Sequence, residues 1–302
     1  MSTSRRSFLK KSALAVAGSA LFSKSLLAGI SKKEVTGIQL YSVRDAMSKD
    51  PLGSLKKVAA MGYKVVEHAN YIDRKFYGYT PSEFKKILDD LGLKMYSGHT
   101  VLGKQHWDES KNDFTDVWKH TVEDAAFMGQ KFVISPWLDE SLRTDYDGLL
   151  RFLDLFNKSG ELCKKHGMMF GYHNHDFEFS ESLNNMNIYD IIMKNTDPKL
   201  VIQQLDIGNM YHAGAKADKI LNKYPGRYSS INVKDEIKTS STETPYESTI
   251  LGKGIINPKE VTDLAIAKGG AWLMIIEQES YQGMDPMDCI KEDLAVMKKW
   301  GY

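Results

Sequence analysis

The chain has 302 residues, of which 42% are hydrophobic and 26% are charged, and its formal net charge is +1. This composition is ordinary for a soluble globular protein, and the near-neutral charge gives no electrostatic case for binding nucleic acid or a membrane surface. Only two cysteines are present, Cys163 and Cys289, and they lie far apart in the sequence. A disulfide scaffold is therefore excluded, and we expect two separate thiols.

The first 30 residues have the organisation of an export signal. A basic start that contains Arg5 and Arg6 precedes a small apolar stretch over 13–22, which ends near Ala28. This order predicts a removable twin-arginine signal peptide over residues 1–30, with a frayed, charged helix as the alternative. The apolar stretch is too short and too rich in small residues for a stable membrane span. We therefore expect a periplasmic protein, free of the membrane in its mature form, that starts near residue 29.

The remainder, residues 31–302, alternates between helical and extended patterns without a linker or a break in composition. Stretches with helical spacing end at glycine, which favours helix C-termini, and short apolar runs follow them. The expected strands cover 38–43, 63–67, 93–97, 132–135 and 228–233, with others that begin at 168, 201 and 272; the expected helices cover 51–61, 81–91, 113–128, 146–166, 189–194, 218–224 and 258–267. This alternation, over a length of this size, predicts one domain with the (β/α)8 TIM-barrel fold.

Polar side chains gather where three expected strands end. His173 and His175 follow the apolar run that begins at 168, Asp206 ends the next run, and Glu277 follows the last one. Because the active site of a TIM barrel lies at the carboxyl ends of its strands, these side chains should meet on one face. Imidazole and carboxylate groups together predict a divalent metal site formed by one of the two histidines, Asp206 and Glu277. Asp206 has a second interpretation, as the cap of a helix after its strand.

A long segment over 234–257, rich in Ser, Thr and Glu, follows the expected strand at 228–233. Segments in this position of a barrel commonly cover the substrate. Gly252 and Gly254 flank a lysine within it. We interpret them as a flexible turn, because no strand and helix of P-loop spacing surround them to make a phosphate site.

Five motifs at the expected strand ends resemble those of the xylose isomerase-like TIM barrel superfamily, which includes sugar isomerases, sugar 3-epimerases and inosose dehydratases. They are GYKVVE at 62–67, YHNH at 172–175, LDIGN at 205–209, VKD at 233–235 and IE at 276–277. The resemblance implies one metal held at the ends of strands five to eight, typically by Glu, Asp, His and Glu. By position it assigns Asp206 and Glu277, with His173 in place of the first Glu and Asn232 in place of the His. Mn²⁺ or Zn²⁺ is the cofactor expected for such a set.

The remaining roles follow from positions after strands. Glu277 is expected to act as base or ligand, and Lys234 as a cation that stabilises an enolate oxygen, unless Lys234 simply pairs with Asp235. Substrate contacts are expected from a set of residues at other strand ends: Glu67, His99, His175, Asn209 and His212. Further histidines, His106, His120 and His166, are interpreted as surface or helix residues, whereas Trp137 is a candidate for the sugar pocket.

Isomerisation, epimerisation and β-elimination of sugars all begin with removal of a proton next to a carbonyl group, which a metal and a nearby base assist. The sequence thus predicts a metal-dependent isomerase or epimerase that acts on a free sugar or a keto-glycoside. Alternatives are a keto-sugar lyase or dehydratase of the same superfamily, and a non-catalytic sugar-binding barrel without metal, which Asn232 favours. An endonuclease IV-like phosphodiesterase is disfavoured by the net charge and the expected export. The expected partner is a small-molecule sugar, and a homo-oligomer remains open.

Replacement of Arg5 and Arg6 by Lys tests the expected export. The twin arginine is the feature that the export route recognises, so the double variant should accumulate as a precursor inside the cell while the unaltered chain reaches the periplasm. Immunoblots of periplasmic and cytoplasmic fractions measure this. Normal export of the double variant would contradict the assignment.

Overall fold

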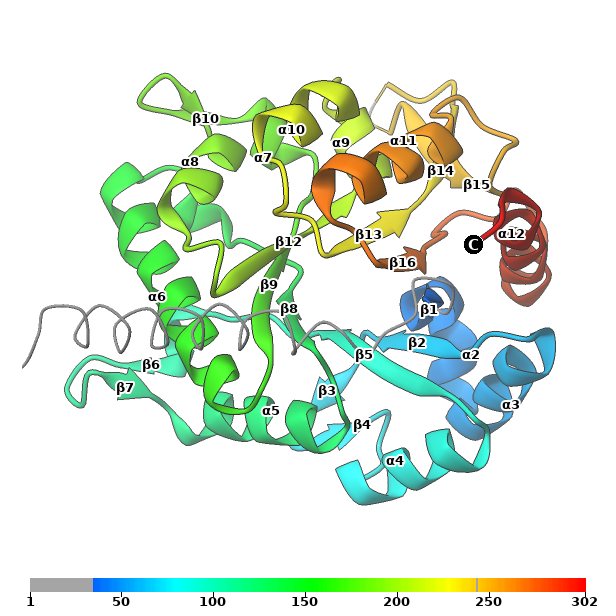
Figure 1. The fold of residues 1–302 in the computed structure, drawn as a ribbon, viewed down its shortest axis with the longest axis horizontal. Helices are drawn as coiled ribbons and strands as arrows, with labels where there is room; N and C mark the ends of the chain where they lie inside the picture. Colours follow the sequence, from blue (N-terminus) through cyan, green and yellow to red (C-terminus); the bar gives the residue numbers. More distant parts are fainter. Residues whose placement is uncertain (1–34, 243) are drawn as a thin grey trace, which may run out of the picture. The chain divides into compact units, whose positions relative to one another are not determined.

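The structure is a computed structural model that describes residues 35–242 and 244–302, so the expected signal peptide lies outside the described residues. Eight parallel strands close into a barrel in the order β1-β16-β13-β12-β9-β8-β5-β2 (Figure 1). They are β1 (Thr36–Gln39), β2 (Val65–His68), β5 (Lys94–His99), β8 (Phe132–Ser135), β9 (Met169–His173), β12 (Val201–Asp206), β13 (Ser230–Val233) and β16 (Leu273–Ile276). Helices surround this barrel, which confirms the predicted (β/α)8 fold.

The helices that follow these strands are mostly long enough to cover the barrel wall. They are α2 (Arg44–Lys49), α3 (Pro51–Met61), α4 (Pro81–Asp90), α5 (Asp116–Phe127), α6 (Tyr146–Lys165), α8 (Ile188–Asn195), α10 (Ala217–Lys223), α11 (Pro258–Leu264) and α12 (Pro286–Trp300). Shorter turns are η1 (Leu40–Val43), η2 (Lys104–His106), η3 (Glu140–Leu142), α7 (Phe177–Ser180), α9 (Ile207–His212) and η4 (Ala265–Gly269). Proline at the first turn of α3, α4, α11 and α12 suits helix N-termini, where its missing N–H breaks no hydrogen bond.

Four two-stranded hairpins extend from loops of the barrel. They are β3 (Tyr71–Ile72) with β4 (Lys75–Phe76), β6 (Trp107–Asp108) with β7 (Asp113–Phe114), β10 (Ser182–Leu183) with β11 (Met186–Asn187), and β14 (Asp235–Lys238) with β15 (Tyr246–Thr249). Each follows the carboxyl end of a barrel strand, or the short segment after it, so all four lie in connections on the side where a TIM barrel has its active site.

The inside of the barrel is polar rather than purely apolar. Glu67 of β2 and Gln204 of β12 are fully buried, and Gln204 Nε2 donates to Glu67 Oε2 at 2.8 Å. Strands β2 and β12 lie opposite each other in the barrel order, so this hydrogen bond spans the interior. Gln39 Nε2 donates to the other oxygen of Glu67 at 2.7 Å, and Ser97 Oγ also donates to Glu67. Such satisfied partners make the burial of these groups tolerable.

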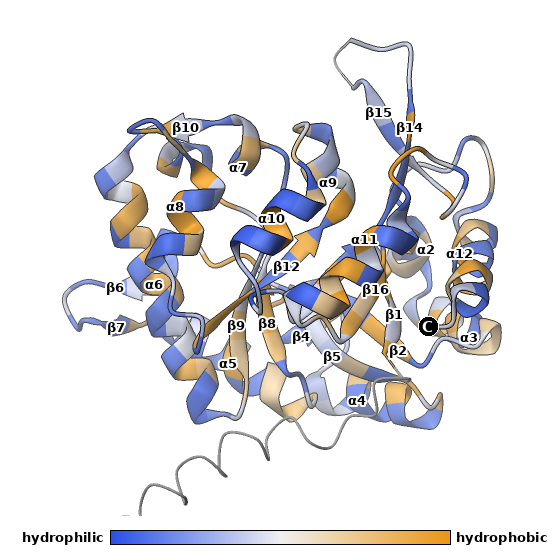
Figure 2. Ribbon diagram, turned by 45° about the horizontal axis from the view of Figure 1, so that its top comes forward, coloured by the Kyte–Doolittle hydropathy of each residue, from blue (hydrophilic) through white to orange (hydrophobic). Residues whose placement is uncertain are grey.

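The apolar core lies between the barrel and its helices. In Figure 2 hydrophobic residues concentrate on strands such as β9, β12 and β16, while the outer faces of helices are hydrophilic. One buried cluster gathers around β1, β2, α3 and α12, and a second gathers around β8, β9, α5 and α6. Trp118 and Phe170 in the second cluster are fully buried, with ring centroids 6.3 Å apart. Burial of this apolar area is the main driving force for the fold.

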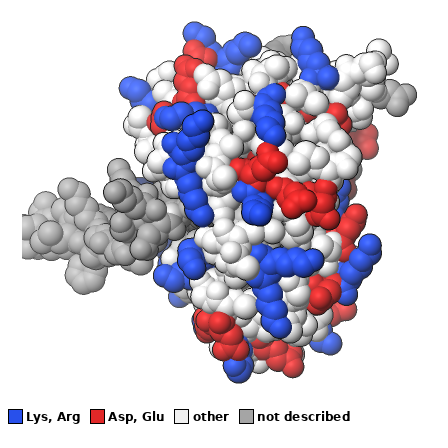
Figure 3. Space-filling model, turned by 90° about the vertical axis from the view of Figure 1, so that its right-hand side faces the viewer, with Lys and Arg blue, Asp and Glu red and all other residues white. Residues whose placement is uncertain are grey.

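Acidic and basic residues are interspersed on the face shown in Figure 3, in agreement with the near-neutral net charge. Among residues 35–242 and 244–302, no helix combines the length and hydropathy that a bilayer crossing requires.

Several boundaries differ from the sequence prediction because side chains redirect the backbone. Strand β1 ends at Gln39 instead of extending to 43, since Gln39 Oε1 accepts a hydrogen bond from Tyr41 N at 3.2 Å and the chain turns into η1. The helix expected over 113–128 begins at Asp116, because the two strands β6 and β7 pair just before it. Helix α12 was not predicted, and α9 is the helix that the alternative interpretation of Asp206 as a cap requires.

The segment over 234–257 is also more ordered than predicted, because it contains the β14–β15 hairpin. Beyond this hairpin, the carboxylate of Asp235 accepts hydrogen bonds from Gly252 N at 2.9 Å, Gly254 N at 3.0 Å and Ile256 N at 3.1 Å. The segment that we expected to be a flexible turn is therefore held by hydrogen bonds to the side chain of Asp235. The suggested pairing of Lys234 with Asp235 is wrong, because Asp235 is bound to these backbone amides.

Asp293 on α12 provides a pH-dependent test of this packing. Its side chain is fully buried and accepts a hydrogen bond from Leu251 N at 2.8 Å, and burial raises the pKa of Asp293 to about 7. Between about pH 4 and 7 the folded state thus keeps a proton that the unfolded chain releases, so stability falls as the pH rises through this window.

Replacement of Asp293 by Asn should remove this loss of folding stability at higher pH, because the amide carries no charge. We expect the variant to be more stable than the parent by about 1–3 kcal/mol near pH 8 and almost equal to it near pH 4. Urea unfolding at both pH values measures the difference. Glu161→Gln, at an exposed position on α6, is the control and should change little. A difference independent of pH would contradict the raised pKa.

Candidate active site

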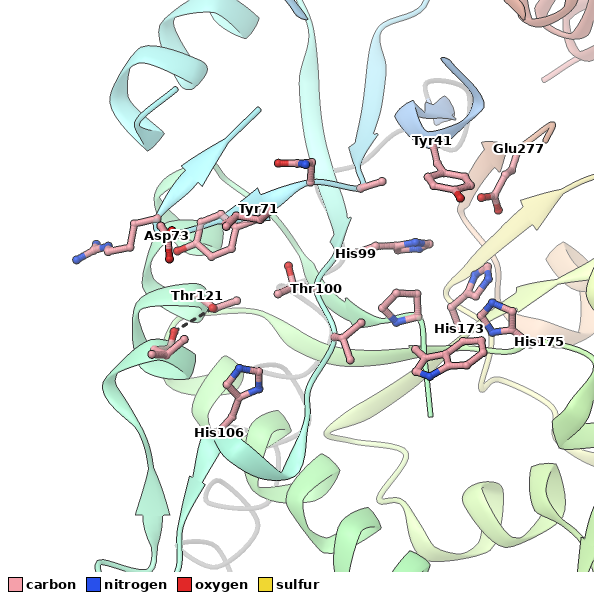
Figure 4. Close-up of a pocket in the computed structure, with 18 of the residues that line it drawn as sticks. Tyr41, Tyr71, Asp73, His99, Thr100, His106, Thr121, His173, His175 and Glu277 are labelled. Atoms are coloured by element: carbon pink, nitrogen blue, oxygen red, sulfur yellow. Dashed lines mark hydrogen bonds between the residues drawn. The ribbon is translucent and has the colours of Figure 1, made fainter. Parts of the chain in front are cut away.

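A cavity of about 860 Å³ opens at the carboxyl ends of the strands. Figure 4 shows Tyr41, His173, His175 and Glu277 around one end of it, with His99 between this end and the rest. These side chains come from β5, β9 and the segments after β1, β9 and β16, so distant parts of the sequence form one polar wall. This is the position expected for the active site of a TIM barrel.

The three predicted metal ligands meet at this end of the cavity. One donor atom from each of His173, Asp206 and Glu277 can be chosen so that all lie within 4.8 Å of one another, and all three side chains are buried. His173 Nε2 is 3.7 Å from Asp206 Oδ2. Burial, together with the charge of His99, holds the pKa of His173 well below its usual range. A neutral imidazole is the form that can bind a metal.

Asp206 uses its two oxygens differently, and the structure confirms its interpretation as a helix cap. Its Oδ1 accepts a hydrogen bond from Asn209 N at 2.8 Å and so caps α9. Its Oδ2 faces Lys234 Nζ at 2.9 Å. Gly208 in this first turn has to be a glycine, because a Cβ there would lie 2.8 Å from Cδ of Lys234 and 2.5 Å from Glu236 Oε1.

Lys234 is the centre of an ion cluster that we define as Lys234, Asp206, Glu277 and Glu279. Besides its contact with Asp206, Lys234 Nζ lies 2.5 Å from Glu279 Oε1 and 3.5 Å from Glu277 Oε2. Its side chain is 2% exposed. Burial opposes the positive charge, but the three carboxylates outweigh it and hold the pKa of Lys234 well above its usual range. The cluster therefore contains a permanent internal cation.

The two glutamates of the cluster respond differently to the shared cation. Burial, reinforced by the charges of Glu279 and Asp206, raises the pKa of Glu277 to about 7 against the opposing effect of Lys234. The charge of Lys234 lowers the pKa of Glu279 despite its burial. Glu277 is thus the carboxylate that can exchange a proton near neutral pH.

Asn232 lies beside this cluster on β13. Its Nδ2 donates to Glu277 Oε2 at 2.5 Å, and its buried Oδ1 has no hydrogen-bond partner within the described part of the chain. Asn232 is therefore adjacent to the predicted ligands, as expected, but its amide nitrogen is the atom that contacts Glu277.

His99 faces the cluster from the other side of the cavity. Its Nε2 lies 3.1 Å from Glu67 Oε1 and 2.7 Å from Gln204 Oε1, and its ring is 4.9 Å from that of His173. Burial favours the neutral ring, but the charge and hydrogen bond of Glu67 prevail and raise the pKa of His99 to about 9. Burial likewise opposes ionisation of Glu67, but His99 and the other hydrogen-bond donors lower the pKa of Glu67. The result is a buried ion pair.

Not every expected substrate contact lies in the cavity. His99, His175 and Asn209 line it, as predicted, whereas Glu67 and His212 do not. Glu67 is fully buried under His99 and supports it. His212 Nε2 is 3.3 Å from Glu236 Oε2, and its ring stacks on Tyr246 at 5.4 Å. Glu67 and His212 therefore lie outside the cavity wall, whereas we expected both to contact the substrate.

Some cavity residues were missed by the sequence analysis. Tyr41 and Tyr71 line the cavity, as do His106 and His120, which we expected on the surface or on helices. Tyr71 and His106 follow strands β2 and β5, so their position after a strand end was an available signal. His120 lies on a helix and reaches the cavity only because of how α5 packs. Trp137, a candidate from its place after β8, does line the cavity.

The family described as the xylose isomerase-like TIM barrel matches residues 55–300 of this chain. Two similar curated proteins are inosose dehydratases. That of Clostridium beijerinckii is 25% identical over 197 residues, which cover 60% of this chain and 62% of that protein. That of Clostridium perfringens is 28% identical over 177 residues, which cover 57% of this chain and 49% of that protein. The chain therefore spans about half to three-fifths of the length of these relatives.

Solved structures with the same fold include a sugar phosphate isomerase/epimerase from Parabacteroides distasonis. It is 25% identical, with a TM-score of 0.72, and the match covers 88% of this chain and 98% of that one. The structure of an L-ribulose 3-epimerase is 14% identical, with a TM-score of 0.66 and coverage of 88% of this chain and 95% of that one.

Replacement of Lys234 by Met tests the ion cluster. The change leaves buried carboxylates without their cation, and the loss of one partner of a buried ion pair typically costs about 3–5 kcal/mol. We expect a fall of this size in the free energy of unfolding, measured with urea near pH 7. Lys253→Met is the matched control, because Lys253 Nζ pairs with Glu292 at 2.7 Å on the surface. Exposed pairs contribute about 0–1 kcal/mol, so equal losses in both variants would contradict the cluster.

Proposed function

Because this chain belongs to the xylose isomerase-like TIM barrel family, we propose that it is a metal-dependent enzyme that removes a proton next to the carbonyl group of a sugar. The observation that carries the proposal is the convergence of His173, Asp206 and Glu277 within 4.8 Å at the polar end of the cavity. The activity that we favour is isomerisation or epimerisation of a free sugar or a keto-glycoside.

The donor set fits a divalent metal such as Mn²⁺ or Zn²⁺. One imidazole nitrogen and two carboxylates are ligands that both ions accept. Asn232 adds a buried oxygen beside this set, for which the described part of the chain supplies no hydrogen-bond partner. Lys234 keeps a partner in Glu279 at 2.5 Å if a metal takes the oxygens of Asp206 and Glu277. When bound, the metal would polarise the substrate carbonyl as a Lewis acid.

Two side chains of the protein would then carry out the proton transfers, one as acceptor and one as donor. Glu277 would accept the proton from the carbon next to the carbonyl with the carboxylate oxygen that a metal leaves free. His99, held protonated by Glu67, faces the same space and is the candidate proton donor (Figure 4). Lys234 neutralises Glu279 and Asp206, so that the site does not carry an excess of negative charge. Asn209 and His175 line the wall and would contact sugar hydroxyl groups.

A keto-sugar dehydratase is the second candidate, and His99 is the observation that favours it. Elimination of water requires an acid for the departing hydroxyl group, and the pKa of about 9 for His99 keeps that imidazole protonated at neutral pH. The curated relatives named inosose dehydratase add support at 25–28% identity. The product separates the two candidates, because a dehydratase product lacks one water, whereas an isomerase or epimerase product keeps the substrate mass.

We also propose that the substrate is not phosphorylated. The backbone amides of Gly252 and Gly254, which the sequence offered as a possible phosphate site, bind the carboxylate of Asp235 instead. The twin-arginine signal expected over residues 1–30 supports a periplasmic location, where free sugars and glycosides are available. Both points favour a neutral sugar or glycoside.

Deuterium uptake from heavy water into ketoses and 3-keto-glycosides, with added Mn²⁺ or Zn²⁺, tests the proposed chemistry. Glu277→Gln should reduce the uptake by about 10²- to 10⁴-fold, because the amide cannot accept the proton and binds a metal weakly. The control Glu161→Gln changes an exposed glutamate on α6 and should retain full uptake. Uptake unchanged in Glu277→Gln would remove Glu277 as the base. A panel that shows neither uptake nor turnover with any metal would favour a sugar-binding barrel.

A further inference from the structure

The cavity continues well beyond the polar end that holds Glu277 and the histidines. Figure 4 shows Tyr71, His106 and Thr121 at the opposite end, beyond His99 and Thr100. We call this region the distal compartment and define it by the lining residues Tyr71, Ile72, Val101, His106, Val117 and His120. The total volume of about 860 Å³ lies in the upper part of the roughly 300–1,000 Å³ range of pockets that hold drug-sized ligands. One sugar ring at the polar end would leave this region unfilled.

The distal compartment carries apolar side chains that the protein leaves exposed. Ile72 is 63% exposed, Val117 is 64% exposed and Val101 is 43% exposed. Eight large hydrophobic residues are exposed among residues 35–242 and 244–302, and five of them line this one cavity: Tyr41, Ile72, Val101, Val117 and Trp137. Exposed apolar side chains gathered in one concave region mark a binding surface, whereas scattered ones need no explanation.

The wall of the compartment is held in place by an ion pair between a half-exposed arginine and a buried carboxylate. Arg74 Nε and Nη2 donate to the two oxygens of Asp124 at 3.0 and 2.6 Å, and Tyr71 Oη donates to Asp124 Oδ2 at 2.6 Å. These bonds join the β3–β4 hairpin to α5. Asp73 and Arg74 have φ angles of 50° and 60°, which side chains other than glycine adopt only with some strain. A pre-formed wall of this kind lowers the entropic cost of binding.

Several polar groups of this wall are occupied by the protein itself. Arg74 and the hydroxyl of Tyr71 are bound to Asp124, and Thr121 Oγ1 donates to Val117 O at 3.0 Å. Gly103 N donates to His106 Nδ1 at 3.0 Å. A second sugar ring would require free donors and acceptors for its hydroxyl groups, because polar groups buried without partners are costly. Asn70, Asp73 and Thr100 also line the cavity. The exposed Ile72, Val101 and Val117 are therefore the feature that favours an apolar group over a second sugar.

We propose that the distal compartment binds an apolar, aromatic aglycone, so that the substrate is a glycoside that carries such a group on its sugar. This inference rests on the proposed function, which places the sugar itself at the polar end. Ile72 and Val117 would contact the two sides of the aglycone from β3 and α5, and the ring of Tyr71 would add an aromatic surface.

Binding of matched glycosides tests the inference without any turnover. We would measure, by calorimetry on the full mature chain, the methyl and 4-nitrophenyl β-glycosides of glucose, galactose, mannose and xylose, together with the corresponding β-linked disaccharides. In at least one sugar series the 4-nitrophenyl glycoside should bind at least about 10-fold more tightly than the methyl glycoside, since the ring buries additional apolar area. It should also bind more tightly than the disaccharide.

Two double variants test where the aglycone binds, and each replaces two exposed hydrophobic residues by Ser. Ile72→Ser with Val117→Ser should abolish the preference for the 4-nitrophenyl glycoside and leave the methyl glycoside unchanged. Phe127→Ser with Ile255→Ser removes two other exposed hydrophobic residues, which do not line the cavity, and should retain the preference. Both changes are on the surface, so folding should survive in each.

Three results would overturn the inference: equal binding of both glycosides in every sugar series, tighter binding of the disaccharide, or an unchanged preference in the Ile72 and Val117 variant. Failure of the proposed function would look different. A protein that shows no deuterium uptake, but keeps a preference that depends on Ile72 and Val117, would lose the proposed chemistry and retain the aglycone site.

Discussion

The site depends on one buried cation, the ammonium of Lys234, and on the three carboxylates that surround it. The carboxylates hold the pKa of the buried Lys234 well above its usual range, and the charge of Lys234 in turn lowers the pKa of Glu279. The four groups come from the ends of β12, β13 and β16, which are neighbours in the barrel. Their pairing therefore fixes the relative position of three strand ends. It also leaves Glu277, the member most remote from Lys234, as the one with a pKa near neutrality.

The opposite half of the barrel supports the site in a different way. Glu67 and Gln204 connect β2 to β12 across the interior, and both hold His99. A buried carboxylate with several donors has little freedom to move, so the imidazole above it is held in one orientation. The candidate base and the candidate acid are thus positioned by two buried networks. Gln204 connects them, because its Oε1 lies 3.1 Å from His173 Nδ1, and His173 Nε2 is 3.7 Å from Asp206 Oδ2.

The two ends of the cavity are built from different kinds of structure. The polar end stands on strand ends and the residues directly after them, where backbone hydrogen bonds of the barrel limit movement. The distal compartment is built from a hairpin, a loop and the first turns of α5. Such connections can vary in length and composition without disturbing the barrel, which is why one fold supports many specificities. The proposed chemistry and the proposed aglycone site are therefore placed on different parts of the chain.

Much of this architecture was accessible from the sequence, because its signals are local. Glycines after helical stretches and short apolar runs predicted the barrel, and His173, Asp206 and Glu277 were recognised from their positions after such runs. The sequence prediction failed where the end of an element depends on a hydrogen bond to another residue, or where a helix was overlooked. Gln39 ends β1 early by bonding to Tyr41, and α12 was missed although its Pro286 and Gly301 mark its ends.

The sequence by itself determined the fold and the set of polar residues at the strand ends, since both depend on periodicity and neighbouring residue types. Only the tertiary structure decided how those residues are used. It paired Lys234 with Asp206 and Glu279 instead of Asp235, and it placed Glu67 and His212 outside the cavity. It brought Tyr71, His106 and His120 into the same cavity as Glu277. These outcomes depend on distances between residues far apart in the chain, and closure of the barrel sets such distances.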